Sequence, residues 1–269
     1  MKKVIYHRRG HLGDCVHTMH YMRRLFLYYS DLIIDFYIKP EYIKEITLLI
    51  DDVMKDRVNI LDVNNYKDDM AGVNAWYGEL GEKLVLMSSI PHDIFFIKWF
   101  KTVSDKLGLV NPFQRPEDFL MDNNNILKPN GLSKRYNFLI VNSTALSGQI
   151  ADDDFLMGEI IDYLAQSYQI ITTKKYKEHP CTLDNNLALV DIANISLGCT
   201  GIISIATAPL ILCLNKWTLK TCKEVMIMCQ LFDLYYNLGC PNKFKSFKSI
   251  KGCRDYVFDK ILNRRDLII

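Results

Sequence analysis

Apolar residues in the first half of the chain occur in short continuous runs and, between these runs, at helical spacings. A strand is predicted at residues 4–6, and the helix after the following polar loop carries apolar side chains three or four positions apart, namely Val16, Met19, Met22, Phe26 and Tyr29. Further strands are predicted at 32–38 and 58–63, and helices at 40–49 and 90–110. This alternation of strands and helices is typical of a parallel sheet.

The periodic pattern stops between residues 111 and 132, where prolines and consecutive asparagines replace the spaced apolar positions. This stretch is predicted to be a linker. It divides the chain into a first domain of residues 1–132 and a second of residues 133–269. With 269 residues the chain is long enough for two domains that each bury a core of their own.

Alternating elements resume in the second half. Strands are predicted at 136–141, 169–173 and 187–190, with a helix at 152–167. The segment 196–215, SLGCTGIISIATAPLILCLN, is predicted to form the end of a strand, a tight loop, a short helix and a further strand. Residues 220–238 and 256–264 are predicted to form closing helices. Both halves are therefore expected to form lobes with parallel sheets, and a ligand is expected in the cleft beyond the carboxyl ends of the strands.

Composition narrows the class of protein. With 49% hydrophobic and 24% charged residues the chain is an ordinary globular protein, and a net charge of +2 gives no reason to expect a nucleic-acid partner. The eight cysteines form no CxxC pair, which favours reduced thiols in the cytoplasm. The longest apolar run, 208–214, is too short to span a membrane, whereas peripheral contact with one stays compatible with the sequence. The oligomeric state does not follow from the sequence.

The loop after the first strand lacks the marks of several common sites. Only Gly10 and Gly13 are present where a dinucleotide-binding fingerprint needs three glycines. Four histidines (His7, His11, His17 and His20) are close in sequence but fall on a strand, a loop and a helix, so no metal site is predicted. A nucleophilic Cys15 beside a histidine is a further alternative, for which no third, orienting group is identified.

Two features remain as candidate chemistry. Asp14 stands where the loop becomes a helix, and its carboxylate can either cap free amides or accept a proton from a substrate. In the second half, Cys199, Thr200 and Gly201 form a loop of small residues predicted to open a helix, where free amides can bind a diphosphate. Together they favour group transfer from a nucleotide-linked donor, with a helix cap and a tight turn as the alternative.

Residues 11–25, HLGDCVHTMHYMRRL, resemble the opening motif of the bacterial heptosyltransferase family, glycosyltransferase family 9. Gly13, Asp14, His17 and Thr18 match members that read GDxxHT. Residues 191–214 are similar to the second signature of the family, an Asp-Thr-Gly loop followed by a helix, with Cys199 in place of the aspartate.

The resemblance implies a GT-B-like α/β fold of two Rossmann-like lobes whose parallel sheets face a central cleft, the first lobe on the acceptor side and the second binding the nucleotide sugar. It also implies an inverting, metal-independent transfer of a sugar from a nucleoside diphosphate to a hydroxyl of a glycan or glycolipid, with no cofactor besides this donor. Asp14 takes the role of the base. Contact with the donor diphosphate is expected from Ser143, Thr144, Lys174, Thr200 and Gly201. Glu178 is expected to contact the nucleoside. The residues expected to bind the acceptor or orient the base are His11, His17, Gly13 and Arg9.

Departures from the family pattern keep two alternatives open. Cys199 replaces the expected aspartate, and Ser204 stands where a histidine is common. One alternative is a non-catalytic protein of the same fold that binds a nucleotide sugar or a glycan. The other is a related GT-B enzyme such as an epimerase.

Overall fold

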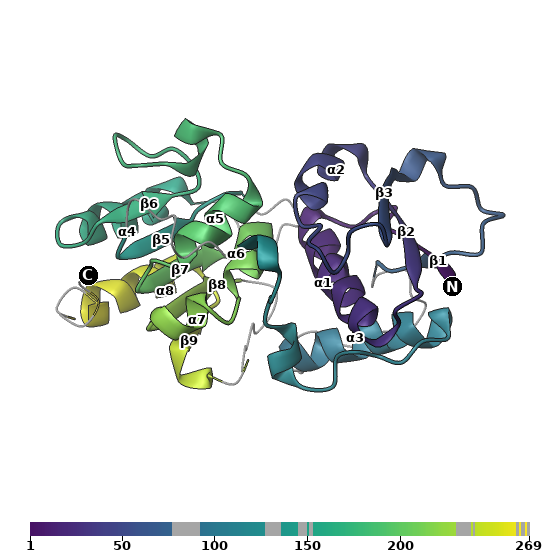
Figure 1. Cartoon of the computed structure of the whole chain (residues 1–269). Helices are drawn as coiled ribbons and strands as arrows, with labels where there is room; N and C mark the ends of the chain where they lie inside the picture. Colours follow the sequence, from purple (N-terminus) through teal and green to yellow (C-terminus); the bar gives the residue numbers. More distant parts are fainter. Residues whose placement is uncertain are drawn as a thin grey trace. The chain divides into compact units, whose positions relative to one another are not determined.

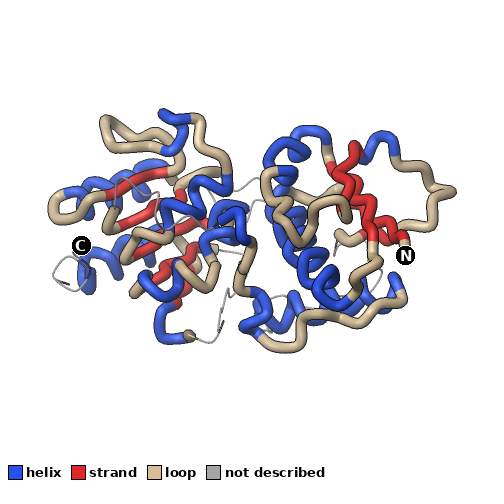
Figure 2. Tube along the Cα trace, in the orientation of Figure 1, coloured by secondary structure: helices blue, strands red, loops and turns tan. Residues whose placement is uncertain are grey.

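The structure, a computed structural model, describes residues 1–76, 92–126, 136–144, 150, 153–229, 238, 240–261, 264 and 267. The chain divides into two compact units, Met1–Asn125 and Ile126–Ile269. In both units strands alternate with helices along the chain, as Figures 1 and 2 show. The predicted boundary after residue 132 lies outside the described residues. Among the described residues no helix is both long enough and apolar enough to cross a membrane.

The sheet of the first unit has four parallel strands, β1 (Lys2–Tyr6), β2 (Ile33–Ile38), β3 (Val58–Asp62) and β4 (Val73–Asn74). Their order is β3-β2-β1-β4. The chain therefore steps in one direction from β1 to β3 and then returns to the other side of β1. Open α/β sheets bind ligands beyond the carboxyl ends of the strands at such a reversal, here between β1 and β4.

Aromatic packing joins two of the helices of this unit, which are α1 (Leu12–Tyr28), α2 (Pro40–Thr47) and α3 (His92–Leu107). Tyr21 of α1 stacks on Phe100 of α3 with ring centroids 4.7 Å apart, and Trp99 stacks on Phe100 at 4.6 Å. The Tyr21 hydroxyl also forms a hydrogen bond of 2.8 Å with Ser104. α1 is therefore packed against α3 at Tyr21.

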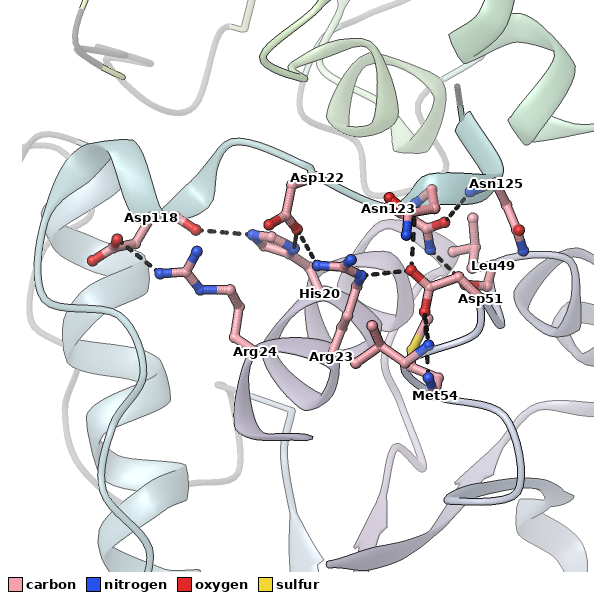
Figure 3. Close-up of polar contacts among 12 residues, drawn as sticks. His20, Arg23, Arg24, Leu49, Asp51, Met54, Asp118, Asp122, Asn123 and Asn125 are labelled. Carbon is pink, nitrogen blue, oxygen red and sulfur yellow. Dashed lines mark hydrogen bonds and ion pairs between the residues drawn. The ribbon is translucent and has the colours of Figure 1, made fainter. Parts of the chain in front are cut away.

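Buried charges connect the last segment of this unit to α1, as Figure 3 shows. Arg23 lies between Asp51, at 2.7 Å, and Asp122, at 2.5 Å. His20 Nε2 donates a hydrogen bond of 2.9 Å to the carbonyl of Asp118, whose carboxylate pairs with Arg24 at 2.9 Å. The Arg23 and Asp51 side chains are only 6% and 0% exposed, so this network lies inside the unit.

The second unit has a sheet of five parallel strands, β5 (Phe138–Val141), β6 (Ile170–Thr172), β7 (Gly201–Ile205), β8 (Glu224–Met228) and β9 (Phe244–Phe247). Their order is β6-β5-β7-β8-β9. The direction of chain progression reverses between β5 and β7, because β6 lies on one side of β5 and β7 on the other. The predicted α/β class with two parallel sheets is confirmed.

Helices pack on this second sheet, and their bounds are α4 (Asp154–Ala165), α5 (Leu189–Ser196), α6 (Ala208–Cys213), α7 (Thr218–Thr221) and α8 (Ile250–Tyr256). Alternate strand residues form one core with α4 and α8. This core includes Phe138, Ile140, Ile203, Ile205, Met226 and Met228. α5 and α6 contact each other.

Three predictions for this unit are wrong. The closing helix predicted at 220–238 is contradicted by the strand β8, which pairs with β7. The predicted strand at 187–190 runs into α5, which begins at Leu189. Within 196–215 the order is the end of α5, a turn, the strand β7 and then α6, so helix and strand are exchanged relative to the prediction. The branched residues Ile202 and Ile203 are fully buried in the sheet, and Pro209 lies in the first turn of α6, where proline is favoured.

Candidate functional site

Asp14 lies in the first turn of α1, at the reversal between β1 and β4. The helix begins at Leu12, three residues earlier than expected from a loop that ends at Asp14, so Gly13 is helical. The backbone N–H of His11, the N-cap residue, donates a hydrogen bond of 2.7 Å to Asp14 Oδ2. The carboxylate therefore caps the helix and is held in a defined position at the carboxyl edge of the sheet.

The surroundings of Asp14 favour proton transfer near neutral pH. The side chain is half-buried, and burial raises its pKa to about 6, against the opposing effects of the His11 amide and of charge on His11 and Lys39. A carboxyl with this pKa is mostly ionised at pH 7 and can still accept a proton. General bases work best with a pKa near the working pH.

The histidines around Asp14 point to different neighbours. His17 packs in the α1–α3 interface with its ring centroid 4.0 Å from that of Phe96, which is a core position rather than the predicted contact with the acceptor or with Asp14. His11 contacts Asp14 through its backbone amide, and the role expected of its side chain stays a prediction. Among the residues that the structure describes, no three His, Cys, Asp or Glu side chains form a group that could hold a metal ion.

Cations and aromatic rings follow the first strand at this edge. Arg9 is exposed in the loop. Arg8 pairs with Asp68 and lies over the rings of Tyr6 and Tyr66, 5.5 Å and 5.6 Å from their centroids. Trp76 follows β4 and is half-buried.

Predicted donor residues meet at the carboxyl edge of the second sheet. Ser143 follows β5 and Lys174 follows β6, and the Ser143 hydroxyl forms a hydrogen bond of 2.7 Å with Thr173. Asn142 Oδ1 accepts hydrogen bonds from the amides of Thr173, at 3.0 Å, and Lys174, at 2.8 Å. Thr144 is exposed beside Ser143. These loops are therefore bound to each other, and they lie next to the reversal between β5 and β7.

Thr200 and Gly201 lie at the opposite edge, and their predicted place at a helix start is wrong. Both amides donate to the carbonyl of Asn137, at 3.0 Å and 2.9 Å, and the Thr200 hydroxyl donates to the carbonyl of Leu267 at 2.7 Å. Gly201 begins the five-residue strand β7, so this edge is about 13 Å from the carboxyl edge at the usual rise of about 3.3 Å per residue. Their amides are not available to a diphosphate, because they hold the start of the sheet together.

The loop that leads from a strand into a helix at the reversal is instead formed by Ala206 and Thr207, between β7 and α6. Thr207 is half-buried, and its hydroxyl donates to the carbonyl of Ile205 at 3.3 Å. Sequence reasoning missed this residue, although Pro209 marks the helix start. This loop, made of Ala206 and Thr207, carries no carboxylate. Cys199 is fully buried, and burial raises the pKa of its thiol well above the usual range.

Glu178, predicted to contact the nucleoside, is exposed in the turn after β6. Lys174 pairs with Asp154 at 2.7 Å, which places one cation and one anion at the start of α4. Both side chains are accessible enough to exchange this contact for one with a ligand, since exposed ion pairs contribute little stability.

Comparisons with known proteins identify the fold. No family model matches the chain, and no curated protein matches it. E. coli heptosyltransferase WaaC with ADP-2-deoxy-2-fluoro heptose is 10% identical over 96% of this chain and 99% of that chain, with a TM-score of 0.56. A glycosyl transferase family 9 protein from Veillonella parvula DSM 2008 is 10% identical over 98% and 91%, with a TM-score of 0.51.

A third similar structure is the iron-containing dodecameric glycosyltransferase TibC from enterotoxigenic E. coli, 12% identical over 85% of this chain and 58% of that chain, with a TM-score of 0.51. The chain therefore has the fold of heptosyltransferases and related glycosyltransferases, in agreement with the resemblance that its opening motif carries.

Proposed function

We propose that this protein is a glycosyltransferase that moves a sugar from a nucleoside diphosphate to a hydroxyl of a glycan or glycolipid, with inversion at the anomeric carbon. The proposal depends on the position and pKa of Asp14. Its carboxyl group has a pKa of about 6 and lies where the strand order of the first sheet reverses, in a chain with the fold of heptosyltransferases. Its role would be that of the general base.

In this reaction Asp14 takes the proton of the acceptor hydroxyl as its oxygen forms a bond to the anomeric carbon. The bond from that carbon to the diphosphate oxygen breaks on the opposite face, and the nucleoside diphosphate leaves with the electron pair. The configuration at the anomeric carbon is inverted, and Asp14 then releases the proton to solvent. The first unit would supply the base and the acceptor contacts, among them Arg9, His11 and the half-buried Trp76.

The second unit would bind the donor through the loops at the carboxyl edge of its sheet. Ser143, Thr144 and Thr207 would donate hydrogen bonds to the diphosphate, Lys174 would offset its charge, and Glu178 would contact the ribose. A nucleotide-sugar donor is supported by the similar structures, since WaaC was solved with an ADP-linked heptose analogue. A screen of nucleoside diphosphates by thermal shift would identify the nucleobase of the donor.

To test whether Asp14 is the general base, the rates of sugar transfer and of donor hydrolysis are compared between Asp14→Asn and the wild type. We expect the rate to fall by about a hundredfold or more, the usual contribution of a general base, with donor affinity retained. Asp52→Asn is the matched control, because Asp52 is an exposed carboxylate of the same unit. An Asp14→Asn rate close to that of the wild type would contradict the assignment of the base.

Metal independence is also part of the proposal, with Lys174 providing positive charge at the diphosphate. Because the similar protein TibC is described as iron-containing, this point needs its own test. Treatment of the purified protein with a chelator should leave the transfer rate unchanged. A rate that is lost on chelation and restored by an added metal ion would contradict it.

A second candidate is a non-catalytic protein that binds a nucleotide sugar or a glycan. It is motivated by Cys199, which replaces the aspartate of the family signature, and by Ser204, which stands where a histidine is common. The loop before α6 also holds no carboxylate. Such a protein would show a thermal shift with a nucleotide sugar, but neither transfer nor hydrolysis in the wild type. An epimerase of the same fold would instead convert the donor sugar without any acceptor.

The free thiols fit a cytoplasmic location, where nucleotide sugars would be available to the protein. All eight cysteines are free, and seven of them are buried. With a lipid-linked acceptor, contact with a membrane would be peripheral.

A further inference from the structure

His7 is a fully buried histidine directly below the loop that leads to Asp14. It follows β1, and its backbone N–H extends the pairing with β2 by donating to the carbonyl of Tyr37 at 2.9 Å. Its Nε2 forms a hydrogen bond of 2.8 Å with the hydroxyl of Thr18 in α1. The ring also meets the edge of Phe36, with centroids 5.5 Å apart. The imidazole is therefore fixed by β2 on one side and by α1 on the other.

Gly10 packs on the remaining edge of this ring. A methyl group added at Gly10 would lie 2.5 Å from His7 Nδ1 and 3.1 Å from Cγ, so no larger residue fits without displacement of the loop or the ring. The reason for glycine here is close approach and not backbone conformation, since among the described glycines a positive φ is recorded at Gly108 alone. The position of Gly10 is thus set by the surface of the His7 ring.

The next residue after Gly10 is His11, whose backbone N–H holds the Asp14 carboxylate at 2.7 Å. We propose that His7 is a positioning residue: its imidazole supports Gly10 and thereby fixes the His11 amide at the point where it holds Asp14. The proposal rests on the proposed function only in giving Asp14 the role of base.

The polarity of the ring supports a specific role. His7 Nδ1 is buried and has no hydrogen-bond partner among the described residues, which is a cost that an apolar side chain of similar size would avoid. Burial also lowers the pKa of His7 to about 3, so the ring is neutral at pH 7. It therefore acts on the loop through its shape and its bond to Thr18, and adds no charge beside Asp14.

The test measures the pKa of Asp14 in the full-length protein without substrate, by NMR titration of its carboxyl carbon. The His11 hydrogen bond lowers this pKa, so a displaced loop must raise it. In Gly10→Ala we expect a rise of about 0.5 to 1. Where transfer is measurable, we expect a loss of about tenfold or more, because small displacements of reacting groups are costly.

His7→Gln provides the second variant, because glutamine can keep the bond to Thr18 while it removes the ring edge beneath Gly10. Alone it should also raise the pKa of Asp14. In the double variant His7→Gln with Gly10→Ala, the added methyl group occupies the vacated space, and the pKa should return toward the wild-type value. The matched control is Gly72→Ala, whose methyl group would meet the Tyr66 hydroxyl at 2.8 Å. It should lower the melting temperature without changing the pKa of Asp14.

An unchanged pKa of Asp14 in both single variants would overturn the proposal, and so would additive effects in the double variant. His7→Gln keeps the test decisive if Gly10→Ala does not fold. Failure of the positioning role and failure of the proposed function can be told apart. A shifted pKa without any transferase activity would support the positioning role and refute the reaction, whereas activity with an unshifted pKa would do the reverse.

Discussion

The Asp14 side chain is half-buried, and burial raises its pKa from 3.8 to about 6. The folded protein thus holds this proton more tightly than the unfolded chain does. The free energy of unfolding therefore falls as the pH rises through the window from about 4 to about 6, and the penalty is fully present above it. The change in pKa corresponds to at most about 3 kcal/mol.

Asp14→Asn should remove this penalty, because an amide keeps the acceptor for the His11 N–H but carries no charge. At pH 7 we expect the variant to be more stable than the wild type by about 1 to 3 kcal/mol, with a smaller difference near pH 4. Urea unfolding at the two pH values measures the free energy of unfolding of the variant and of the wild type. A variant that is less stable than the wild type at pH 7 would show that the charge of Asp14 stabilises the fold.

Among the elements, α1 depends on the charged network at its second half. Arg23→Met leaves the carboxylates of Asp51 and Asp122 without their cation, and Asp51 is completely buried. We expect a loss of about 3 to 5 kcal/mol in the free energy of unfolding, the usual effect of breaking a buried ion pair from one side. The control is Lys101→Met, which breaks an exposed pair with Asp105 on α3 and should cost less than about 1 kcal/mol. Equal losses in the two variants would contradict the importance of burial here.

The two ends of β7 should respond differently to the same substitution. Thr200→Val removes the hydrogen bond to Leu267 at the amino end, and should lower stability by about 1 to 3 kcal/mol without changing the affinity for a nucleoside diphosphate. Thr207→Val, at the carboxyl end, should weaken binding by about tenfold with little change in stability, as expected from the loss of one hydrogen bond to a charged group. Isothermal titration with both variants decides which end binds. The opposite result would restore Thr200 as a donor contact.

Local signals explain which elements could be predicted from the sequence. Strands such as β2 and the long helix α1 carry strong periodicity, and they lie within a few residues of their predicted bounds. The segment around β7 carries a weaker signal, because Gly201–Ile205 and Ala208–Cys213 are both short, apolar and consecutive. Which run is the strand is decided by pairing with β5 and β8, and this pairing is a tertiary contact.

Dependence on tertiary contacts also limits which residues of the site could be predicted from the sequence. Asp14 could be placed from its position after a strand and loop, because both features are local. The core position of His17 depends on α3, which is distant in sequence. The support of Gly10 by His7 requires the ring to be fixed by Thr18 and Phe36, and no sequence spacing indicates this.

At the scale of the whole molecule, the two units should respond separately to the donor. Each has its own sheet and its own packed helices, so unfolding of the chain need not be a single transition. A nucleoside diphosphate at a hundredfold excess over its dissociation constant stabilises the unit that binds it by about 2.7 kcal/mol. Hydrogen exchange on the full chain should therefore show protection in the loops after β5, β6 and β7, with the loop from Arg8 to His11 unchanged until an acceptor is added. Protection by the donor in the first unit alone would reverse the assignment of the donor and acceptor sides.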